Sequence, residues 1–151
     1  MLTSFFCCPV CGELLVGERT LTCSNGHSFD KSKYHYVNLL LSNRSAGKRH
    51  GDDNLMVRSR GEFLDKGYYG PVRQAVLDVL RACAVPGMRL LDAGCGECWY
   101  TAYFAAELSE FAPHVAGVDI SKDALRWGAK RGGVELAVAS TAHLPVADAS
   151  C

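Results

Sequence analysis

Three cysteines and one histidine near the amino terminus have the residue types and the spacing of a metal site. Cys8, Cys11, Cys23 and His27 follow the pattern C-x2-C-x11-C-x3-H. Three thiolates and one imidazole supply the four tetrahedral ligands that Zn²⁺ takes in closed structural sites. Because four protein ligands leave no position for water, the pattern predicts a structural zinc and not a hydrolytic one.

Turn-forming residues lie in the gaps of this pattern. Pro9 lies inside the first cysteine pair, Gly12 comes directly after it, and Asn25-Gly26 comes directly before the histidine. Asn-Gly is a strong turn signal because both residues accept a positive φ. With a short strand at 20–22, the simplest picture is two metal-binding knuckles joined by a β-ribbon.

Two other interpretations of the cysteines stay open. Clustered cysteines can be small buried hydrophobic residues without a metal. The pair Cys8 and Cys11 also has the spacing of a redox motif, but no βαβ pattern surrounds it, which disfavours that chemistry. The adjacent Cys7 is a spare thiol, since Cys8 has the better spacing to its partner.

A second group of chemistry-bearing residues follows in the middle of the chain. Asp92-x-Gly94-x-Gly96 lies where a strand turns into a helix, so bare backbone and helix amides can approach an anionic ligand. Asp119 ends the next strand, where a carboxylate can accept both hydroxyls of an adenosine ribose. The pattern favours S-adenosylmethionine over a nicotinamide dinucleotide, because Trp99 occupies the third glycine position of G-x-G-x-x-G. A packing turn with an incidental aspartate is the alternative.

Regular α/β alternation surrounds this loop. The hydrophobic periodicity predicts helices over 56–64, 71–83, 100–111 and 121–131, and strands over 89–93, 114–119 and 135–139. Strands and helices of these lengths in alternation indicate parallel strands with right-handed crossovers. We expect an α/β chain: a small zinc-ribbon-like module (1–35), a connecting segment (36–70), and the first half of a Rossmann-like class I methyltransferase domain (71–151).

The last predicted strand has consequences for assembly. About three parallel strands are half of a doubly wound sheet, so we expect a truncated form of a longer protein. The strand at 135–139 should then have an unpaired edge, which is a pairing hazard and predicts poor solubility or a homodimer.

The composition indicates a globular protein and excludes a disordered chain. Apolar residues make up 48% of the chain, charged residues 21%, and the formal net charge is zero, which is typical of a globular protein. No secretory leader or membrane-spanning run is visible, and four of the eight cysteines cluster near the amino terminus, so we expect a reduced, cytoplasmic protein without membrane contacts. A basic stretch suits either RNA phosphates or a solvated linker: Arg44, Lys48, Arg49, His50, Arg58 and Arg60.

Taken together, these residues resemble the bacterial 23S ribosomal RNA guanine-N1 methyltransferases, which include relatives that confer macrolide resistance. The resemblance covers essentially the whole chain, and its most specific part is R-x-x-F-L-D-x-G-x-Y, from Arg60 to Tyr69. Other matching segments are the zinc set, 36–40, Gly51-Asp52, 91–101 and 117–122. Cys98 departs from the family, which usually has a third loop glycine there.

The resemblance implies a function and its residues. It implies that the zinc module helps to grip a hairpin of the ribosomal RNA, which is methylated with S-adenosylmethionine as the cofactor. The implied cofactor contacts are Tyr69, Gly94, Gly96, Tyr100, Thr101 and Asp119, with amides and a hydroxyl at the start of the helix after the loop meeting the methionine carboxylate. The family's second half would supply most of the target-base pocket, so we expect this chain to be inactive alone.

Two hypotheses from other classes compete with this one. The chain can be a non-catalytic zinc module that binds RNA or protein and carries a remnant Rossmann-like domain. It can also be a nicotinamide-dependent enzyme, which Trp99 disfavours. The response of tryptophan fluorescence to each cofactor would separate these hypotheses.

Overall fold

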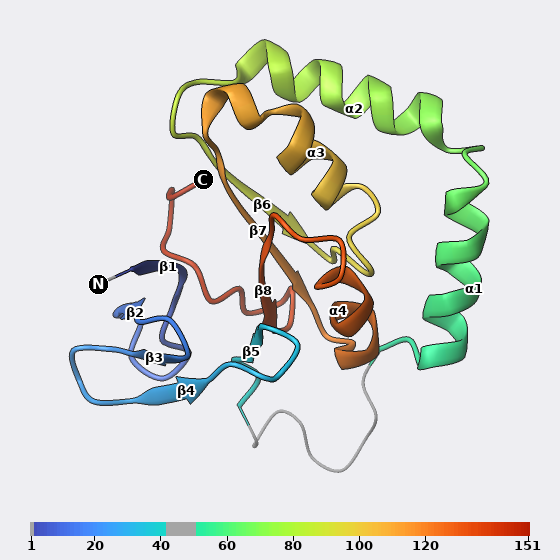
Figure 1. Ribbon diagram of the computed structural model, residues 1–151. Coiled ribbons are helices and arrows are strands. Elements are labelled where there is room, and N and C mark those ends of the chain that lie inside the picture. The colour runs from blue at the N-terminus through green and yellow to red at the C-terminus, as the bar shows by residue number, and fades with distance from the viewer. Residues whose placement is uncertain (1, 42–50) are drawn as a thin grey trace.

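The chain forms two β-sheets, one antiparallel and one parallel, in a computed structural model that describes residues 2–41 and 51–151 (Figure 1). The antiparallel sheet has the order β1-β2-β3-β4 and the parallel sheet the order β5-β8-β7-β6. Their bounds are β1 Thr3–Cys7, β2 Leu14–Val16, β3 Thr20–Thr22, β4 Ser28–Asp30, β5 Tyr36–Asn38, β6 Arg89–Ala93, β7 His114–Asp119 and β8 Glu135–Val138.

The antiparallel sheet builds the zinc module from two hairpins. The predicted strand at 20–22 is confirmed as β3, and it pairs with β4 across the Asn25-Gly26 turn. Gly26 has φ +82°, the left-handed conformation that this turn requires. The ribbon is therefore wider than predicted, because β1 and β2 form a second hairpin beside it.

The parallel sheet contains the three strands that the hydrophobic pattern predicts, β6, β7 and β8, and one that it did not. β5 pairs in parallel with β8, with Val37 opposite Ala137. The expected unpaired edge at 135–139 is therefore wrong: β8 is an inner strand between β5 and β7. Within the described residues the outer strands of the sheet are β5 and β6 instead; Val37 of β5 makes an isolated bridge to Lys31.

The helices largely follow the predicted spans. They are α1 (Asn54–Asp65), α2 (Gly70–Cys83), α3 (Thr101–Glu107) and α4 (Lys122–Gly128), with a 3₁₀ turn η2 at Ser109–Phe111. The helix expected over 100–111 is shorter, because a 3₁₀ turn and a left-handed Ala112 end it. Ser121 caps α4, where its Oγ accepts the Ala124 amide at 3.1 Å.

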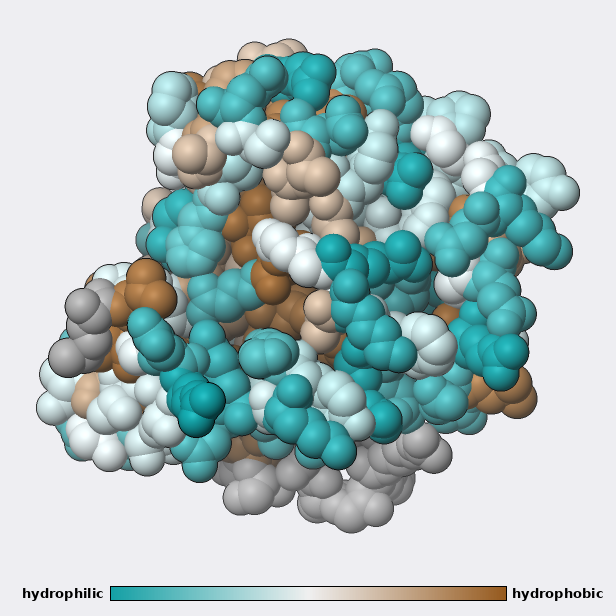
Figure 2. Space-filling model, in the orientation of Figure 1, coloured by the Kyte–Doolittle hydropathy of each residue, from teal (hydrophilic) through white to brown (hydrophobic). Residues whose placement is uncertain are grey.

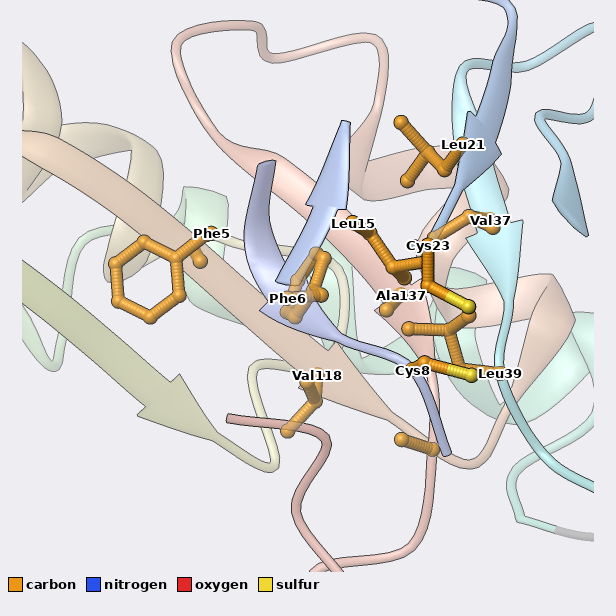
Figure 3. Packing of buried hydrophobic residues seen from close by; sticks show 12 residues of the cluster. Phe5, Phe6, Cys8, Leu15, Leu21, Cys23, Val37, Leu39, Val118 and Ala137 are labelled. Atoms are coloured by element: carbon orange, nitrogen blue, oxygen red, sulfur yellow. The ribbon is translucent and has the colours of Figure 1, made fainter. Parts of the chain in front are cut away.

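Alternate strand residues place different layers on the two faces of the parallel sheet. Ala116, Val118 and Ala137 face the zinc module, whose Phe6 and Leu15 pack beside them (Figure 3). The opposite residues, including Leu136 and Val138, pack against Leu125 of α4 and the two loop cysteines, Cys95 and Cys98. Both faces of a parallel sheet must be covered, and here the zinc module covers one of them.

No helix among the described residues is long and apolar enough to cross a bilayer.

Candidate zinc centre and cofactor site

The two hairpins of the zinc module bring the four predicted ligands together. Cys8 and Cys11 follow β1, and Cys23 and His27 lie between β3 and β4. Their ligand atoms all lie within 4.8 Å of one another. The Cys11 and Cys23 sulfurs are 3.7 Å apart, and His27 Nδ1 lies 3.5 Å from Cys8 Sγ and 3.4 Å from Cys23 Sγ. A tetrahedron with Zn–S bonds of about 2.3 Å has edges of about 3.8 Å, so the cluster fits zinc.

The surroundings of the cluster favour a bound cation. Hydrogen bonds, the largest contribution being that of the Asn25 side chain, lower the pKa of the Cys11 thiol to about 6, which favours the thiolate that a metal needs. Burial raises the pKa of Cys8, whose charge a metal would neutralise. Cys7 lies outside the cluster: it is buried, and its amide donates to the Pro145 carbonyl at 2.7 Å.

The glycine loop and the end of β7 meet at the carboxyl edge of the parallel sheet. Asp119 Oδ2 accepts the Gly96 amide at 2.9 Å, and Oδ1 accepts the Ser121 amide at 2.8 Å. Gly94 and Gly96 have φ +94° and +56°, and a Cβ at either would meet no atom within 4 Å. The loop thus presents bare backbone to open space, a cradle that suits a closely bound ligand.

Asp92 gives this edge a second carboxylate. Thr101, which is fully buried, donates its hydroxyl to Asp92 Oδ2 at 2.5 Å. Burial raises the pKa of Asp92, and the neighbouring charge of Asp119 raises it further, although the Thr101 hydrogen bond opposes both. Two carboxylates that disfavour each other's charge are stabilised by a cationic group placed beside them. The Thr101 proton is already donated, so the expected donation to a ligand carboxylate competes with Asp92.

A cavity of about 310 Å³ opens beside this edge, between α2, α3 and the free edge of β6. It brings together four residues that the sequence singled out, namely Asp92, Gly94, Tyr100 and Thr101. Hydrophobic side chains complete its lining: Val76, Leu80, Leu90, Leu91 and Phe104, with Cys95. The cavity therefore has a polar end at the loop and an apolar wall, whereas Gly96 and Asp119 are not part of its lining.

Tyr69 lies apart from the other predicted cofactor residues. It precedes α2, its side chain is 44% exposed, and its ring packs edge-on against Phe63 of α1 at 5.9 Å. The junction of α1 and α2 stands away from the glycine loop in Figure 1. Its part in cofactor binding stays a prediction.

Sequence reasoning missed Arg73, which ties α2 to the loop. Its guanidinium carbon lies 3.7 Å from the ring centroid of Trp99 and 3.9 Å from that of Tyr103, and Nη1 donates to the Trp99 carbonyl at 3.2 Å. This sandwich fixes the residue that precedes Tyr100. No local spacing signals it, because Arg73 lies 26 residues before Trp99 and still further from Tyr103.

Cys98 is strained at its glycine position. It has φ +62° and is fully buried, and a Cβ on Gly128 of α4 would come within 2.8 Å of its sulfur. A hydrogen bond with Cys98 and, to a smaller extent, burial raise the pKa of the Cys95 thiol, so we expect Cys95 to be a neutral packing group.

The described part of the basic stretch is paired internally. Arg58 binds Glu62 at 2.8 Å, and Arg60 forms an ion pair with Asp52. These two cations therefore favour the interpretation of a solvated face. The other four residues of the stretch, Arg44, Lys48, Arg49 and His50, lie outside the described residues.

Comparisons with known proteins support both halves of this picture. Residues 6–45 match the family described as RlmA, N-terminal, a zinc ribbon, and residues 90–151 match the family described as Methyltransferase domain. The chain joins an RlmA-type zinc ribbon to a methyltransferase domain. A methyltransferase domain of this kind implies S-adenosylmethionine, and the open glycine cradle beside Asp119 fits it.

Sequence relatives name the same class of enzyme. The chain is 35% identical to the 23S rRNA (guanine(748)-N(1))-methyltransferase of Streptomyces fradiae, over 82% of this chain and 43% of that protein. It is 36% identical to a candidate 23S rRNA (guanine-N(1)-)-methyltransferase of Micromonospora griseorubida, over 95% of this chain and 54% of that protein. A Bacillus subtilis relative with a similar name is 29% identical. The chain is thus a homologue of these methyltransferases and spans about half their length.

Proposed function

We propose that this chain carries the zinc module and the methyl-donor half of an S-adenosylmethionine-dependent 23S rRNA guanine-N1 methyltransferase. The observation that carries the proposal is the Asp119–Gly96 hydrogen bond. It holds the glycine loop and the carboxylate at the end of β7 next to each other, as a nucleoside site requires. The names of the relatives supply the substrate, a guanine N1 in 23S ribosomal RNA. We extend the proposal to an RNA hairpin loop, a cytoplasmic location and a link to macrolide resistance.

The residues of the site divide the work of holding the cofactor. Bound S-adenosylmethionine supplies a methyl group that its sulfonium already activates. The oxygens of Asp119 accept the ribose hydroxyls beside the two backbone amides that they bind now. Gly94 and Gly96 leave room for close approach. Asp92 and Asp119 together favour a ligand with positive charge, because it relieves their mutual repulsion.

The RNA side of the reaction depends on alignment. Guanine N1 carries a proton at neutral pH, so a group must accept it, and we assign that role to none of the described residues. A base in a hairpin loop can be splayed from its stack at modest cost. The described residues supply the cofactor loop but no assigned proton acceptor, so we expect this chain alone to bind the cofactor without completing methyl transfer.

A titration followed by tryptophan fluorescence tests the cofactor half of the proposal. The chain has two tryptophans, and Trp127→Phe leaves Trp99, which is 5% exposed and packs on Tyr100. We expect S-adenosylmethionine to change this signal and NADH to leave it unchanged. The demethylated product S-adenosylhomocysteine lacks the sulfonium charge and should bind more weakly.

Asp119→Ala should weaken S-adenosylmethionine binding by about tenfold to a hundredfold, because hydrogen bonds to a charged group are worth about 1.5–3 kcal/mol. Asp78→Asn is the matched control, since that carboxylate pairs with Gln74 on the outside of α2. Equal affinities of both variants and the parent would contradict the assigned site. RNA binding by a chain that shows no affinity for S-adenosylmethionine would favour the non-catalytic zinc module instead.

A further inference from the structure

The outer face of α4 and the turn that follows it carry a row of cations. Lys122 and Arg126 lie on α4, Lys130 lies two residues beyond its end, and all three are exposed. Residues four apart on a helix, as Lys122 and Arg126 are, lie on one side about 6 Å from each other. Lys130 Nζ lies 4.1 Å from the ring centroid of Trp127. Figure 2 shows hydrophilic side chains gathered over α4 on the face turned to the viewer.

A tyrosine from the segment before β5 stands beside this row. The Arg126 guanidinium lies 4.6 Å from the ring centroid of Tyr34 and donates from Nη2 to its hydroxyl at 3.1 Å. Lys33 Nζ lies 5.1 Å from the centroid of the same ring. Partial burial acts to raise the pKa of Tyr34, but these two cations outweigh it and lower the pKa. The local field is therefore positive.

The turn before β5 holds the tyrosine in place. The Ser32 amide donates to the Tyr36 carbonyl at 2.8 Å, and the Tyr34 amide donates to Ser32 Oγ at 3.2 Å. His35 has φ +66°, a conformation that a non-glycine residue adopts only where the surroundings impose it. These contacts fix the backbone at Tyr34, and the hydrogen bond from Arg126 holds its hydroxyl.

Acidic residues are scarce in both segments. Residues 31–35 contain Lys31 and Lys33 and no acid, and residues 121–134 contain four cations and one acid, Asp123. Asp123 lies 3.6 Å from Arg126, whose side chain is still 47% exposed. The zero net charge of the whole chain therefore conceals a positive surface at this place.

We propose that Lys33, Tyr34, Lys122, Arg126 and Lys130 form an RNA-binding surface, the Tyr34 patch, which holds the phosphate backbone and one unstacked base of the ribosomal RNA substrate. Cations that follow a backbone and an aromatic ring that stacks a base are the two parts of single-stranded nucleic-acid sites. The inference rests on the proposed function. α4 begins directly after its cap, Ser121, and so starts close to Asp119 at the end of β7. RNA bound to this patch would therefore lie near the cofactor site.

Binding of a labelled 23S rRNA hairpin at several salt concentrations tests the patch. We expect Arg126→Ala to lower the slope of log affinity against log salt by about 0.7–0.9, the value for one lost phosphate contact. Tyr34→Leu should weaken binding about tenfold, because base stacking on an aromatic ring is lost. Tyr34→Phe keeps the ring and should bind within about twofold of the parent.

Matched controls separate the patch from general effects. Arg81→Ala removes an exposed cation that pairs with Glu107 and Glu110 away from α4, and it should leave the salt slope unchanged. Arg126→Lys should restore most of the slope, which also shows that loss in the alanine variant is not unfolding. Poly-glutamate should compete poorly with the hairpin if the surface recognises RNA and not an acidic protein.

The outcomes distinguish the two proposals. If the parent chain does not bind the hairpin, the RNA substrate of the proposed function fails and the patch fails with it. If the parent binds but the Tyr34 and Arg126 variants keep its affinity and salt slope, only the patch is wrong. Equal competition by poly-glutamate would also overturn the patch while leaving the cofactor site intact.

Discussion

The zinc module and the cofactor site differ in how completely the described chain builds them. The four zinc ligands come from two hairpins within 20 residues and close a tetrahedron by themselves. The cofactor site draws on residues from 92 to 119 and faces a cavity beside the unpaired edge of β6. A metal site needs only local chain, whereas a nucleoside site needs a sheet, its helices and a far wall.

Loss of the zinc tests whether the zinc module is needed to hold the cofactor site together. Cys23→Ser should abolish cooperative unfolding of the whole chain, because structural zinc contributes about 10 kcal/mol or more and total stabilities are about 5–15 kcal/mol. Phe6 and Leu15 of the module cover one face of the parallel sheet, so the loss should spread to the cofactor site (Figure 3). Calorimetry with measurement of the zinc content checks this result.

Two cysteine variants serve as controls for that change. Cys83→Ser alters an exposed thiol of α2, and Cys7→Ala removes the buried neighbour of the first ligand. Both should keep one zinc per chain. A Cys23→Ser protein with full zinc content and an unchanged melting temperature would show that the cluster is not the ligand set.

The contact between the two regions gives the next largest effect. Glu135 accepts the Ser4 hydroxyl at 2.5 Å, the Phe5 amide at 3.0 Å and His114 Nε2 at 2.8 Å, so one carboxylate of β8 ties β1 to the sheet. Glu135→Ala leaves these partners without their acceptor and should lower the free energy of unfolding by about 3 kcal/mol. Urea denaturation measures it.

An exposed glutamate supplies the comparison. Glu107 lies 4.0 Å from Arg81 with a side chain 45% exposed, and Glu107→Ala should cost less than about 1 kcal/mol. Faster hydrogen exchange confined to β1 in Glu135→Ala would show that the two regions separate there. Equal costs for the two variants would mean that the module is held by apolar packing alone.

The same contrast explains what the sequence could predict. The zinc ligands, β6, β7 and the Ser121 cap were predictable because spacing, periodicity and turn residues act over short segments. β5 was missed because three residues carry no clear periodicity, and only pairing with β8, a hundred residues later, makes them a strand. The wrong edge prediction followed from that omission. The hydrogen bonds from Ser4 and Phe5 to Glu135 join chain segments about 130 residues apart, so no local sequence pattern predicts them.

Arg73 sharpens the comparison on the cofactor side. Arg73→Ala removes the guanidinium between Trp99 and Tyr103 and should cost about 1–2 kcal/mol, the range for a partly desolvated cation–π contact with its packing. Trp99 emission should shift to longer wavelength as the ring gains water. Arg73→Lys keeps the charge but not the planar guanidinium that stacks on the two rings, so it should recover only part of the lost stability. Arg81→Ala on the same helix should leave the emission unchanged.

The smallest predicted effect is a gain in stability, at Asp92. Its pKa is raised by burial in the fold, so the folded chain binds this proton more tightly than the unfolded chain does. Stability is then lost as pH rises from about 4, the ordinary pKa of aspartate, through the raised folded value, and stays lower at neutral pH. Asp92→Asn cannot ionise, and its amide oxygen can still accept the Thr101 hydroxyl. The variant should therefore melt at a slightly higher temperature than the parent at pH 7, and the difference should vanish below pH 4.

Cofactor affinity should move in the opposite direction in the same variant, because the charge that is costly in the free protein favours a cationic ligand. Asp92→Asn should weaken S-adenosylmethionine and affect uncharged-sulfur S-adenosylhomocysteine less. A variant that melts lower than the parent at pH 7 would show that the carboxylate stabilises the fold. Equal loss for both ligands would show that Asp92 shapes the loop without sensing the sulfonium. Either result would contradict the difference proposed between the two sites. In the zinc site the metal neutralises the thiolates, whereas in the cofactor site Asp92 and Asp119 are neutralised only when the cationic ligand binds.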